Sequence, residues 1–196
     1  MTDNINTQDW KTLLAQAQAA NPQPHNRFAQ LATLRGGAEP RPAVRTVAVR
    51  FFLEDGRLMI STDTRSEKVQ ELAANPVCEL CWYFTETREQ FRISARAHVV
   101  PAGIAQLDGR LAEVIQRTWL ERSANARQSY TWPQPLRKRD EQSAYAASVP
   151  DEIPDNFALL LLDIVTVDYL NIAEQPHQRC VFNKLGGQWR GRVVNP

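Results

Sequence analysis

Basic side chains gather around one expected strand–turn–helix segment of the chain. Arg45 and Arg50 fall on opposite faces of an expected strand, and Thr62 ends the next strand. The tetrapeptide 65–68 (Arg-Ser-Glu-Lys) then opens a helix, where free N–H groups and the helix dipole favour an anion. Arg binds a phosphate through two hydrogen bonds, and Lys adds a point charge. The segment therefore predicts a phosphate site that includes Ser66.

The same residues also allow a simpler interpretation. A basic helix start can lie in water, with its cations paired to Glu67 and Glu71 further along the helix. Physical chemistry alone does not separate this arrangement from a phosphate site, and both stay open at this point.

The cysteines invite a redox or zinc interpretation, because Cys78 and Cys81 form a C-x-x-C pair. The pair lies in an expected strand, where an odd spacing puts the two side chains on opposite faces. Neither a second C-x-x-C pair nor paired histidines complete a metal site, and Cys180 makes the cysteine count odd. Buried, unreactive thiols are therefore expected.

Three stretches around the predicted phosphate site resemble the FMN-binding core of pyridoxamine 5′-phosphate oxidases. They are 45–50 (RTVAVR), 61–68 (STDTRSEK) and 88–93 (REQFRI), and the end of the chain, 188–196, resembles the ending of that family. The resemblance runs over residues 26–196 and is strongest to the plant and cyanobacterial-type branch. It implies an antiparallel split β-barrel of the FMN-binding type, mainly β (α+β) with peripheral helices, that forms a homodimer with FMN at the subunit interface.

The resemblance also implies roles for individual residues, most of them in binding FMN. A cation near the pyrimidine edge of the flavin stabilises negative charge on the reduced ring, which suits hydride chemistry. The residues implied to hold the phosphate are Arg45, Arg65, Ser66 and Lys68. The ribityl chain and ring are implied to contact the backbone around Val47, Val49, Arg50, Ser61 and Thr62, with Gln90 and Arg179 at the ring edges. The partner subunit is implied to contribute Gln142 and Ser143.

Several positions depart from the family pattern. Glu67 places an anion at the phosphate site where Arg is usual, and Arg65 is the candidate to compensate for it. Leu170 stands where the family usually has Trp, and Gln175 where an Arg clamps the substrate. A Lys that helps to hold the substrate is replaced by Arg50. The family's Tyr/Arg/Ser clamp has no clear match, and the candidates to substitute for it are Arg122 and Arg127.

These departures leave three hypotheses. The first is an FMN-dependent oxidoreductase with an open substrate, for which His177 and Arg179 are the candidate catalytic residues and no metal is expected. The second is a non-catalytic protein of the same fold that binds FMN or a B6 vitamer. The third is an interaction dimer that has lost the cofactor.

The elements that must position these residues are mostly short strands. Arg45, Val47, Val49 and Phe51 are expected on one strand face. The helix opened by 65–68 is expected to be capped by Asp63 or Thr64. Expected strands are 43–52, 58–62, 77–84, 90–100, 157–165, 167–172, 179–184 and 188–194, with 157–172 allowed to be continuous. Expected helices are one around Trp10–Ala17, a short one presenting Phe28, Leu31 and Leu34, one over 65–74 and one over 102–120, followed by a long excursion over 121–154.

The length, charge and composition of the chain limit the classes of protein to which it can belong. The chain has 196 residues and a net charge of +1, which fits one domain and gives no global attraction to nucleic acid or an anionic membrane. That domain is expected to span 1–196, with 1–25 as an N-terminal helical extension. No apolar run approaches the roughly 20 residues of a membrane helix, and the N-terminus is polar, so a cytoplasmic protein with a small-molecule substrate is expected.

Overall fold

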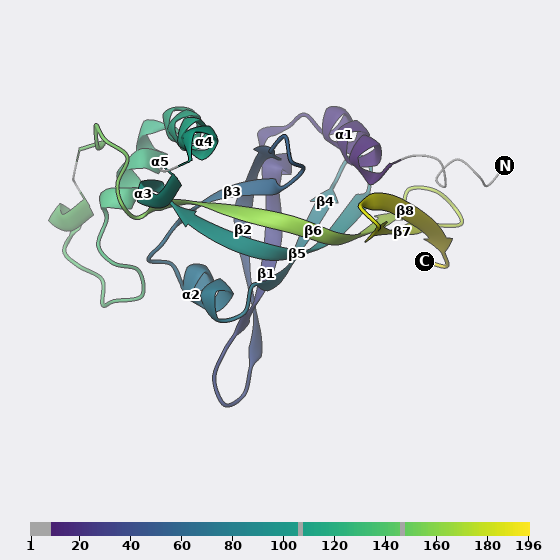
Figure 1. Cartoon of the computed structure of the whole chain (residues 1–196), viewed down its shortest axis with the longest axis horizontal. Helices are drawn as coiled ribbons and strands as arrows, with labels where there is room; N and C mark the ends of the chain where they lie inside the picture. The colour runs from purple at the N-terminus through teal and green to yellow at the C-terminus, as the bar shows by residue number, and fades with distance from the viewer. Residues whose placement is uncertain (1–8, 106–107, 146–147) are drawn as a thin grey trace.

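A closed antiparallel β-barrel forms the centre of the computed structural model, which describes residues 9–105, 108–145 and 148–196 (Figure 1). Its strands lie in the order β3-β2-β1-β4-β5-β6, and β3 pairs again with β6 to close the barrel. β7 and β8 continue the sheet beyond β6. This confirms the predicted split-barrel fold. The strands are β1 Phe28–Arg35, β2 Arg41–Phe52, β3 Leu58–Asp63, β4 Val77–Phe84, β5 Glu89–Pro101, β6 Phe157–Asn171, β7 Gln178–Leu185 and β8 Gln188–Val194.

Alternating apolar side chains fill the barrel. Leu31, Leu80, Ile93 and Val167 stand opposite one another in register across four strands, and all four are fully buried. Helix α1 (Trp10–Ala20) adds its own buried face to this core. Side chains with a period of two on neighbouring strands thus meet inside the barrel, as their sequence pattern predicts.

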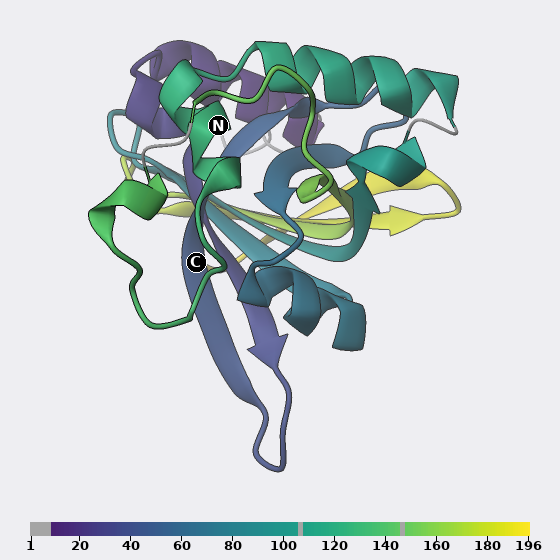
Figure 2. The same ribbon diagram turned by 90° about the vertical axis from the view of Figure 1, so that its left-hand side faces the viewer.

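A second apolar cluster lies on the outside of the barrel wall. Phe157, Leu159 and Leu161 of β6 contribute to it, whereas Leu160 and Leu162 face the barrel interior. The continuous apolar run of β6 is explained by this burial on both faces. The helices α3 Ala102–Ala105 and α4 Gly109–Leu120 cover this cluster, and α5 Ala124–Gln128 follows them. Helix α2 (Glu67–Ala74) lies on the opposite side of the barrel (Figure 2).

The short helix expected after residue 24, with Phe28, Leu31 and Leu34 on one face, is wrong for these three residues, because a 3-10 helix spans only Pro24–Arg27 and strand β1 follows it. Phe28, Leu31 and Leu34 have helical spacing, yet Ala29, Leu31 and Thr33 are the buried residues, with a period of two. Phe28 is 47% exposed. β1 pairs with β2 on one side and β4 on the other, so sheet pairing outweighs the local helical pattern.

Two β-bulges change the expected strand faces. Val49 pairs with Ile60 and Phe51 with Met59, so Arg50 is an extra residue in β2. Phe51 therefore packs against the outer cluster and not beside Val49, contrary to the prediction. A second bulge, at residue 165 of β6, interrupts the alternation of buried and exposed side chains. The expected strands 157–165 and 167–172 therefore form one strand. A bulge can re-aim a side chain, and Arg50 stands at one.

The helices also differ from expectation at their ends. α2 begins at Glu67 with Ser66 as its N-cap, so neither Asp63 nor Thr64 caps it. Asp63 instead accepts a hydrogen bond from the Arg65 backbone N–H (2.8 Å) in the preceding turn. The helix expected over 102–120 consists of α3 and α4, and its residues 106–107 lie outside the described residues.

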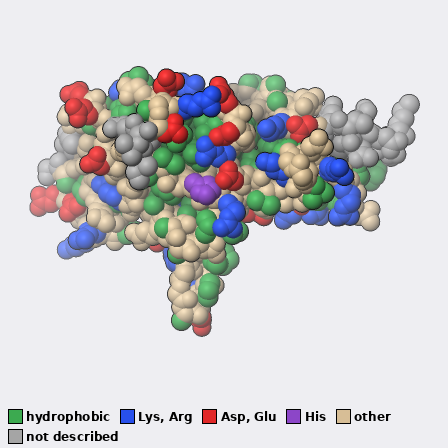
Figure 3. Space-filling view, in the orientation of Figure 1, with side chains coloured by type: hydrophobic (Ala, Val, Ile, Leu, Met, Phe, Trp, Pro, Cys, Tyr) green, Lys and Arg blue, Asp and Glu red, His purple; other side chains and the backbone are tan. Residues whose placement is uncertain are grey.

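The ends of β1 and β2 form a ribbon that projects from the rest of the molecule (Figure 1). Its tip, residues 36–41, is fully exposed, and Val44 in β2 is 63% exposed. Hydrophobic side chains run along the ribbon on the face shown in Figure 3, whereas acidic and basic side chains are mixed over the body. Within the described ranges, no helix is long and apolar enough to cross a membrane. The cytoplasmic location stays a prediction.

Candidate functional site

The start of α2 gathers hydroxyl groups around one ammonium group. Lys68 Nζ donates to Thr62 Oγ1 (3.2 Å) and to Ser66 Oγ (2.9 Å). Burial and the charge of nearby Arg45 lower the pKa of Lys68. Among the residues the structure describes, no carboxylate lies within ion-pair distance of this ammonium. A partly buried cation with only hydroxyl partners is suited to bind an anion.

Arg45 lies close to this cluster but is held by a carboxylate. Arg45 Nη2 lies 2.6 Å from Glu71 Oε2, and Thr33 Oγ1 donates to the same oxygen at 2.6 Å. The Glu71 side chain is only 5% exposed. Burial opposes its ionisation, but hydrogen bonds from Thr33, Arg35 and Arg45 outweigh burial and hold the pKa of Glu71 below its ordinary value. Arg45 is thus fixed beside the helix start.

Glu67 pairs with Arg35 of β1 (2.8 Å). Arg65 pairs with Asp63 (2.6 Å). It also donates to the backbone carbonyl oxygens of Tyr130 (3.2 Å) and Trp132 (2.8 Å). Arg65 therefore connects the long segment 121–154 to the start of α2. The charge of Glu67 is balanced by Arg35 in β1. The ion pair of Arg35 with Glu67 had no local signal, because it joins segments that are distant in the chain.

A second basic cluster lies on the outer face of β2 and β3, under the segment that follows α4. Arg122 Nη1 donates to Ser61 Oγ (2.5 Å), and its guanidinium lies over the Tyr130 ring, 5.0 Å from the centroid. The Nε atoms of Arg50 and Arg122 are buried and have no hydrogen-bond partner within the described part of the chain. Burial, followed by the charges of Arg122 and Arg27, lowers the pKa of Arg50. Buried, unpaired donors of one sign are costly unless an anion binds them.

The residues expected at the flavin ring form a row on the outer sheet face. Gln90 of β5 stands opposite Leu170 of β6, which stands opposite Arg179 of β7. Arg179 donates to Asp168 at 3.0 Å and 2.7 Å, and Arg92 pairs with the same carboxylate. The structure therefore brings Gln90 and Arg179 to either side of the position that holds Leu170.

The remaining predicted residues are placed as follows. The Val47 and Val49 side chains are buried in the barrel core, so only their backbone is available to a ligand. Gln142 is exposed at the start of a short 3-10 helix, Gln142–Tyr145, and the side chain of Ser143 lies outside the described residues. His177 lies in the β6–β7 connection, with its Nε2 3.1 Å from Gln175 Nε2. No acidic, histidine or cysteine cluster in the described ranges is suited to a metal.

The cysteines lie as the strand pattern predicts. Cys78 is buried and Cys81 half-buried on the other face of β4, and Cys78, Cys81 and Cys180 are all free thiols. Burial raises the pKa of Cys78 to about 11.

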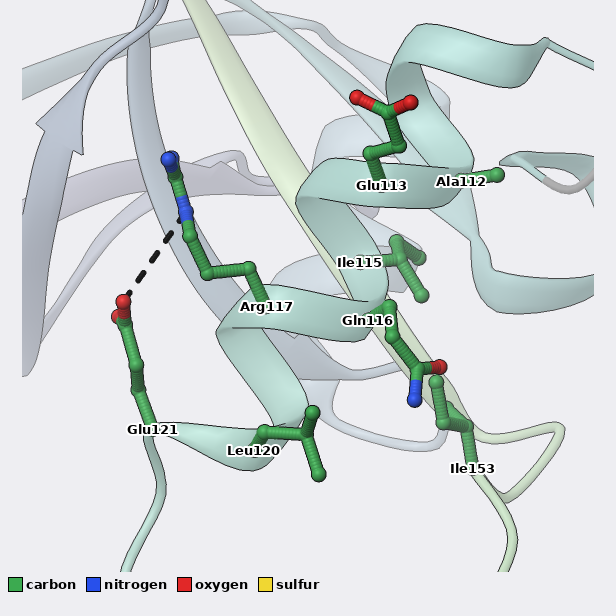
Figure 4. Close-up of a pocket in the computed structure, with 8 residues that line it drawn as sticks. All are labelled: Ala112, Glu113, Ile115, Gln116, Arg117, Leu120, Glu121 and Ile153. Carbon is green, nitrogen blue, oxygen red and sulfur yellow. Dashed lines mark ion pairs between the residues drawn. The ribbon is translucent and has the colours of Figure 1, made fainter.

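An open groove of about 730 Å³ runs along α4 (Figure 4). Ile115, Leu120 and Ile153 give it an apolar lining, and Arg117 pairs with Glu121 at its edge (4.0 Å). None of the residues predicted to bind FMN lines this groove. The groove is therefore separate from the site at α2.

The fold and the helix-start cluster define a split-barrel domain of the FMN-binding type. Residues 7–101 match the family model described as pyridoxamine 5′-phosphate oxidase, FMN-binding domain. A pyridoxine/pyridoxamine 5′-phosphate oxidase 2 of Arabidopsis thaliana is 38% identical over 197 residues, covering 95% of this chain and 96% of the relative. The chain belongs to the pyridoxamine 5′-phosphate oxidase family.

Solved structures agree with this assignment. A pyridoxamine 5′-phosphate oxidase-related, FMN-binding protein of Nostoc punctiforme superposes with a TM-score of 0.88 at 36% identity, covering 96% of this chain and 98% of the other. PhzG of Burkholderia lata superposes with a TM-score of 0.74 at 19% identity, covering 95% and 90% of the two chains, and shows the fold alone.

Proposed function

We propose that this protein is an FMN-dependent oxidoreductase and that the phosphate of FMN binds at the start of α2. The observation that carries the proposal is the Lys68 ammonium, which is partly buried against Thr62 and Ser66 hydroxyls without a carboxylate in the described structure. A phosphate oxygen fits this donor set and would supply the missing negative charge. The bound flavin would supply hydride chemistry, while the chain binds and orients it.

We further infer a homodimer with FMN between the subunits. Thr62 and Lys68 lie at the end of the barrel beside α2, whereas Gln90 and Arg179 lie on the outer sheet face, and none of the interactions described above joins the two pairs. A second chain would bring its own Gln90 and Arg179 to the flavin held by the first. Exposed apolar side chains on the same outer face support this interface; they are Phe28, Val44 and Tyr83.

The Arg50–Arg122 cluster favours an anionic substrate. Both guanidinium groups are partly buried and carry Nε donors without a partner among the described residues, and that of Arg122 donates to Ser61, which is expected along the flavin. The curated relatives of this chain are named as oxidases of pyridoxine and pyridoxamine 5′-phosphate. A phosphorylated B6 vitamer, with its phosphate at Arg50 and Arg122, is therefore the proposed substrate.

One observation favours a second function, the binding of FMN or a B6 vitamer without turnover. Gln175 is uncharged and exposed, and its amide contacts the His177 ring instead of presenting a cation. An uncharged side chain there weakens the hold on an anionic substrate.

An oxygen-dependent assay separates the two functions. Protein loaded with FMN is mixed with pyridoxamine 5′-phosphate or pyridoxine 5′-phosphate, and formation of the aldehyde product is followed by absorbance. An oxidase forms product, loses activity in Lys68→Met, and keeps it in Arg57→Gln, which alters an ion pair with Asp55 in the β2–β3 turn. Bound FMN and bound vitamer with no product would identify the binding protein instead.

A further inference from the structure

Arg35 bridges the two carboxylates of α2. Its Nη2 lies 2.8 Å from Glu67 Oε1 and its Nε lies 3.1 Å from Glu71 Oε1. Glu67 and Glu71 are four residues apart, so both project from one face of the helix toward the end of β1. The second oxygen of Glu71 is taken by Arg45 and by the Thr33 hydroxyl. Every charged group on this face is thus part of one network.

The network leaves the helix start with a small positive charge. Arg35, Arg45 and Lys68 supply three cations against the carboxylates of Glu67 and Glu71, a net charge of +1. Without Arg35 the cluster would be neutral. A phosphate monoester carries about −1.5 to −2 charges at neutral pH, so this difference alters its attraction to the site.

The geometry of Glu71 gives Arg35 a second effect. A bound phosphate would compete with Glu71 for Arg45, because Glu71 Oε2 lies 2.6 Å from Arg45 Nη2. Arg35 occupies the other oxygen of Glu71 and thereby withdraws negative charge from the contact with Arg45. Arg35 also keeps the half-exposed Glu67 side chain directed at β1 and away from its neighbour Lys68.

We propose that Arg35 is a positioning residue for FMN. By neutralising Glu67 and sharing Glu71, it leaves Arg45 and Lys68 available to the FMN phosphate, which Arg35 itself does not contact. This inference rests on the proposed FMN site and assigns a binding role to a strand residue outside it.

The test compares the binding of FMN with the binding of riboflavin, which has the same ring and no phosphate. Dissociation constants are measured by quenching of flavin fluorescence with the full-length apoprotein and its variants. Arg35→Gln is expected to raise the constant for FMN about tenfold and to leave the constant for riboflavin unchanged. Arg57→Gln, which disturbs an ion pair with Asp55 away from α2, is the matched control and is expected to change neither.

Removal of the Glu67 carboxylate, which Arg35 neutralises, should restore the affinity for FMN that Arg35→Gln loses. The double variant Arg35→Gln/Glu67→Gln is expected to bind FMN within about threefold of the natural chain, and Glu67→Gln alone to bind it about two- to fivefold more tightly. Glu67→Gln keeps all the contacts of Glu71, so it tests the charge effect even where Arg35→Gln folds poorly.

Three outcomes would overturn the role of Arg35. They are an unchanged constant for FMN in Arg35→Gln, an equal loss of FMN and riboflavin, and a double variant no better than Arg35→Gln. A natural chain that binds no FMN would instead contradict the proposed function, so the two failures are distinguishable.

Discussion

The two basic clusters of this protein differ in how their charges are balanced. At α2, Arg35 and Arg45 are paired with Glu67 and Glu71, and the resulting network connects β1, β2 and the helix. On the outer face of β2, the charges of Arg122 and Arg27 act on Arg50 and that of Glu121 opposes them more weakly, while the buried Nε atoms of Arg50 and Arg122 have no hydrogen-bond partner among the described residues. We expect the paired cluster to stabilise the fold and to position the proposed FMN site, whereas an anionic ligand would balance the second cluster.

The largest expected effect follows from breaking the paired cluster at its buried carboxylate. Glu71→Ala leaves Arg45 without its carboxylate partner and Arg35 with Glu67 alone, and should lower the free energy of unfolding by about 3–5 kcal/mol. Urea denaturation of the apoprotein measures this change. Asp55→Ala, which removes the partner of Arg57 in an exposed turn, should cost about 0–1 kcal/mol. Equal losses in the two variants would contradict a structural role for the α2 network.

The next effect concerns Lys68, the α2 cation for which the described residues offer no carboxylate partner. Lys68→Met removes a charged hydrogen-bond donor and should raise the dissociation constant of FMN roughly 10- to 100-fold, as expected for about 1.5–3 kcal/mol. Fluorescence titration measures this, with riboflavin as the ligand that lacks the phosphate. Apoprotein stability should not fall, because a partly buried charge is removed. Unchanged FMN binding would place the phosphate elsewhere.

The unpaired cluster should respond in the opposite way. Arg50→Met removes repulsion with Arg122, so the apoprotein should keep its stability or gain about 1 kcal/mol, while affinity for pyridoxamine 5′-phosphate falls about tenfold. Thermal unfolding and equilibrium dialysis measure the two quantities. Arg110→Met, at a residue whose side chain is 89% exposed, should change neither by more than about 0.5 kcal/mol. A loss of stability in Arg50→Met would show that this arginine supports the fold.

The smallest effect is a pH dependence of the paired cluster. The pKa of Glu71 is lowered in the folded chain, so its contribution to stability is present above the ordinary glutamate pKa near 4.3 and is lost as the pH falls through the lowered value. Urea denaturation between about pH 6 and pH 3 should show this decline. Glu71→Gln removes the titrating group and should flatten the curve. An identical slope in both proteins would exclude Glu71 as its source.

Local pattern predicted those parts of the fold and site that depend on neighbouring residues. The expected strand end at Thr62 and the expected helix start at 65–68 agree closely with the observed end of β3 at Asp63 and start of α2 at Glu67. They bring Ser66 and Lys68 into contact. The β6 run of apolar residues was likewise recognised as a strand.

Contacts between distant segments were not predicted. β1 has helical spacing and becomes a strand because β2 and β4 pair with it. The bulge at Arg50 does not interrupt the apolar pattern of β2, so the turn of Phe51 to the outer cluster had no local signal. Arg35 and Glu67 are 32 positions apart, and only the closed barrel brings them within 2.8 Å.

The measurement that tests the central claim most directly is gel filtration with light scattering and a flavin absorption spectrum, after incubation with FMN. The account predicts flavin absorbance that co-elutes with a species of twice the 22.3 kDa chain mass. A colourless protein after incubation would contradict the FMN site at α2, and flavin bound to a single chain would contradict the shared interface.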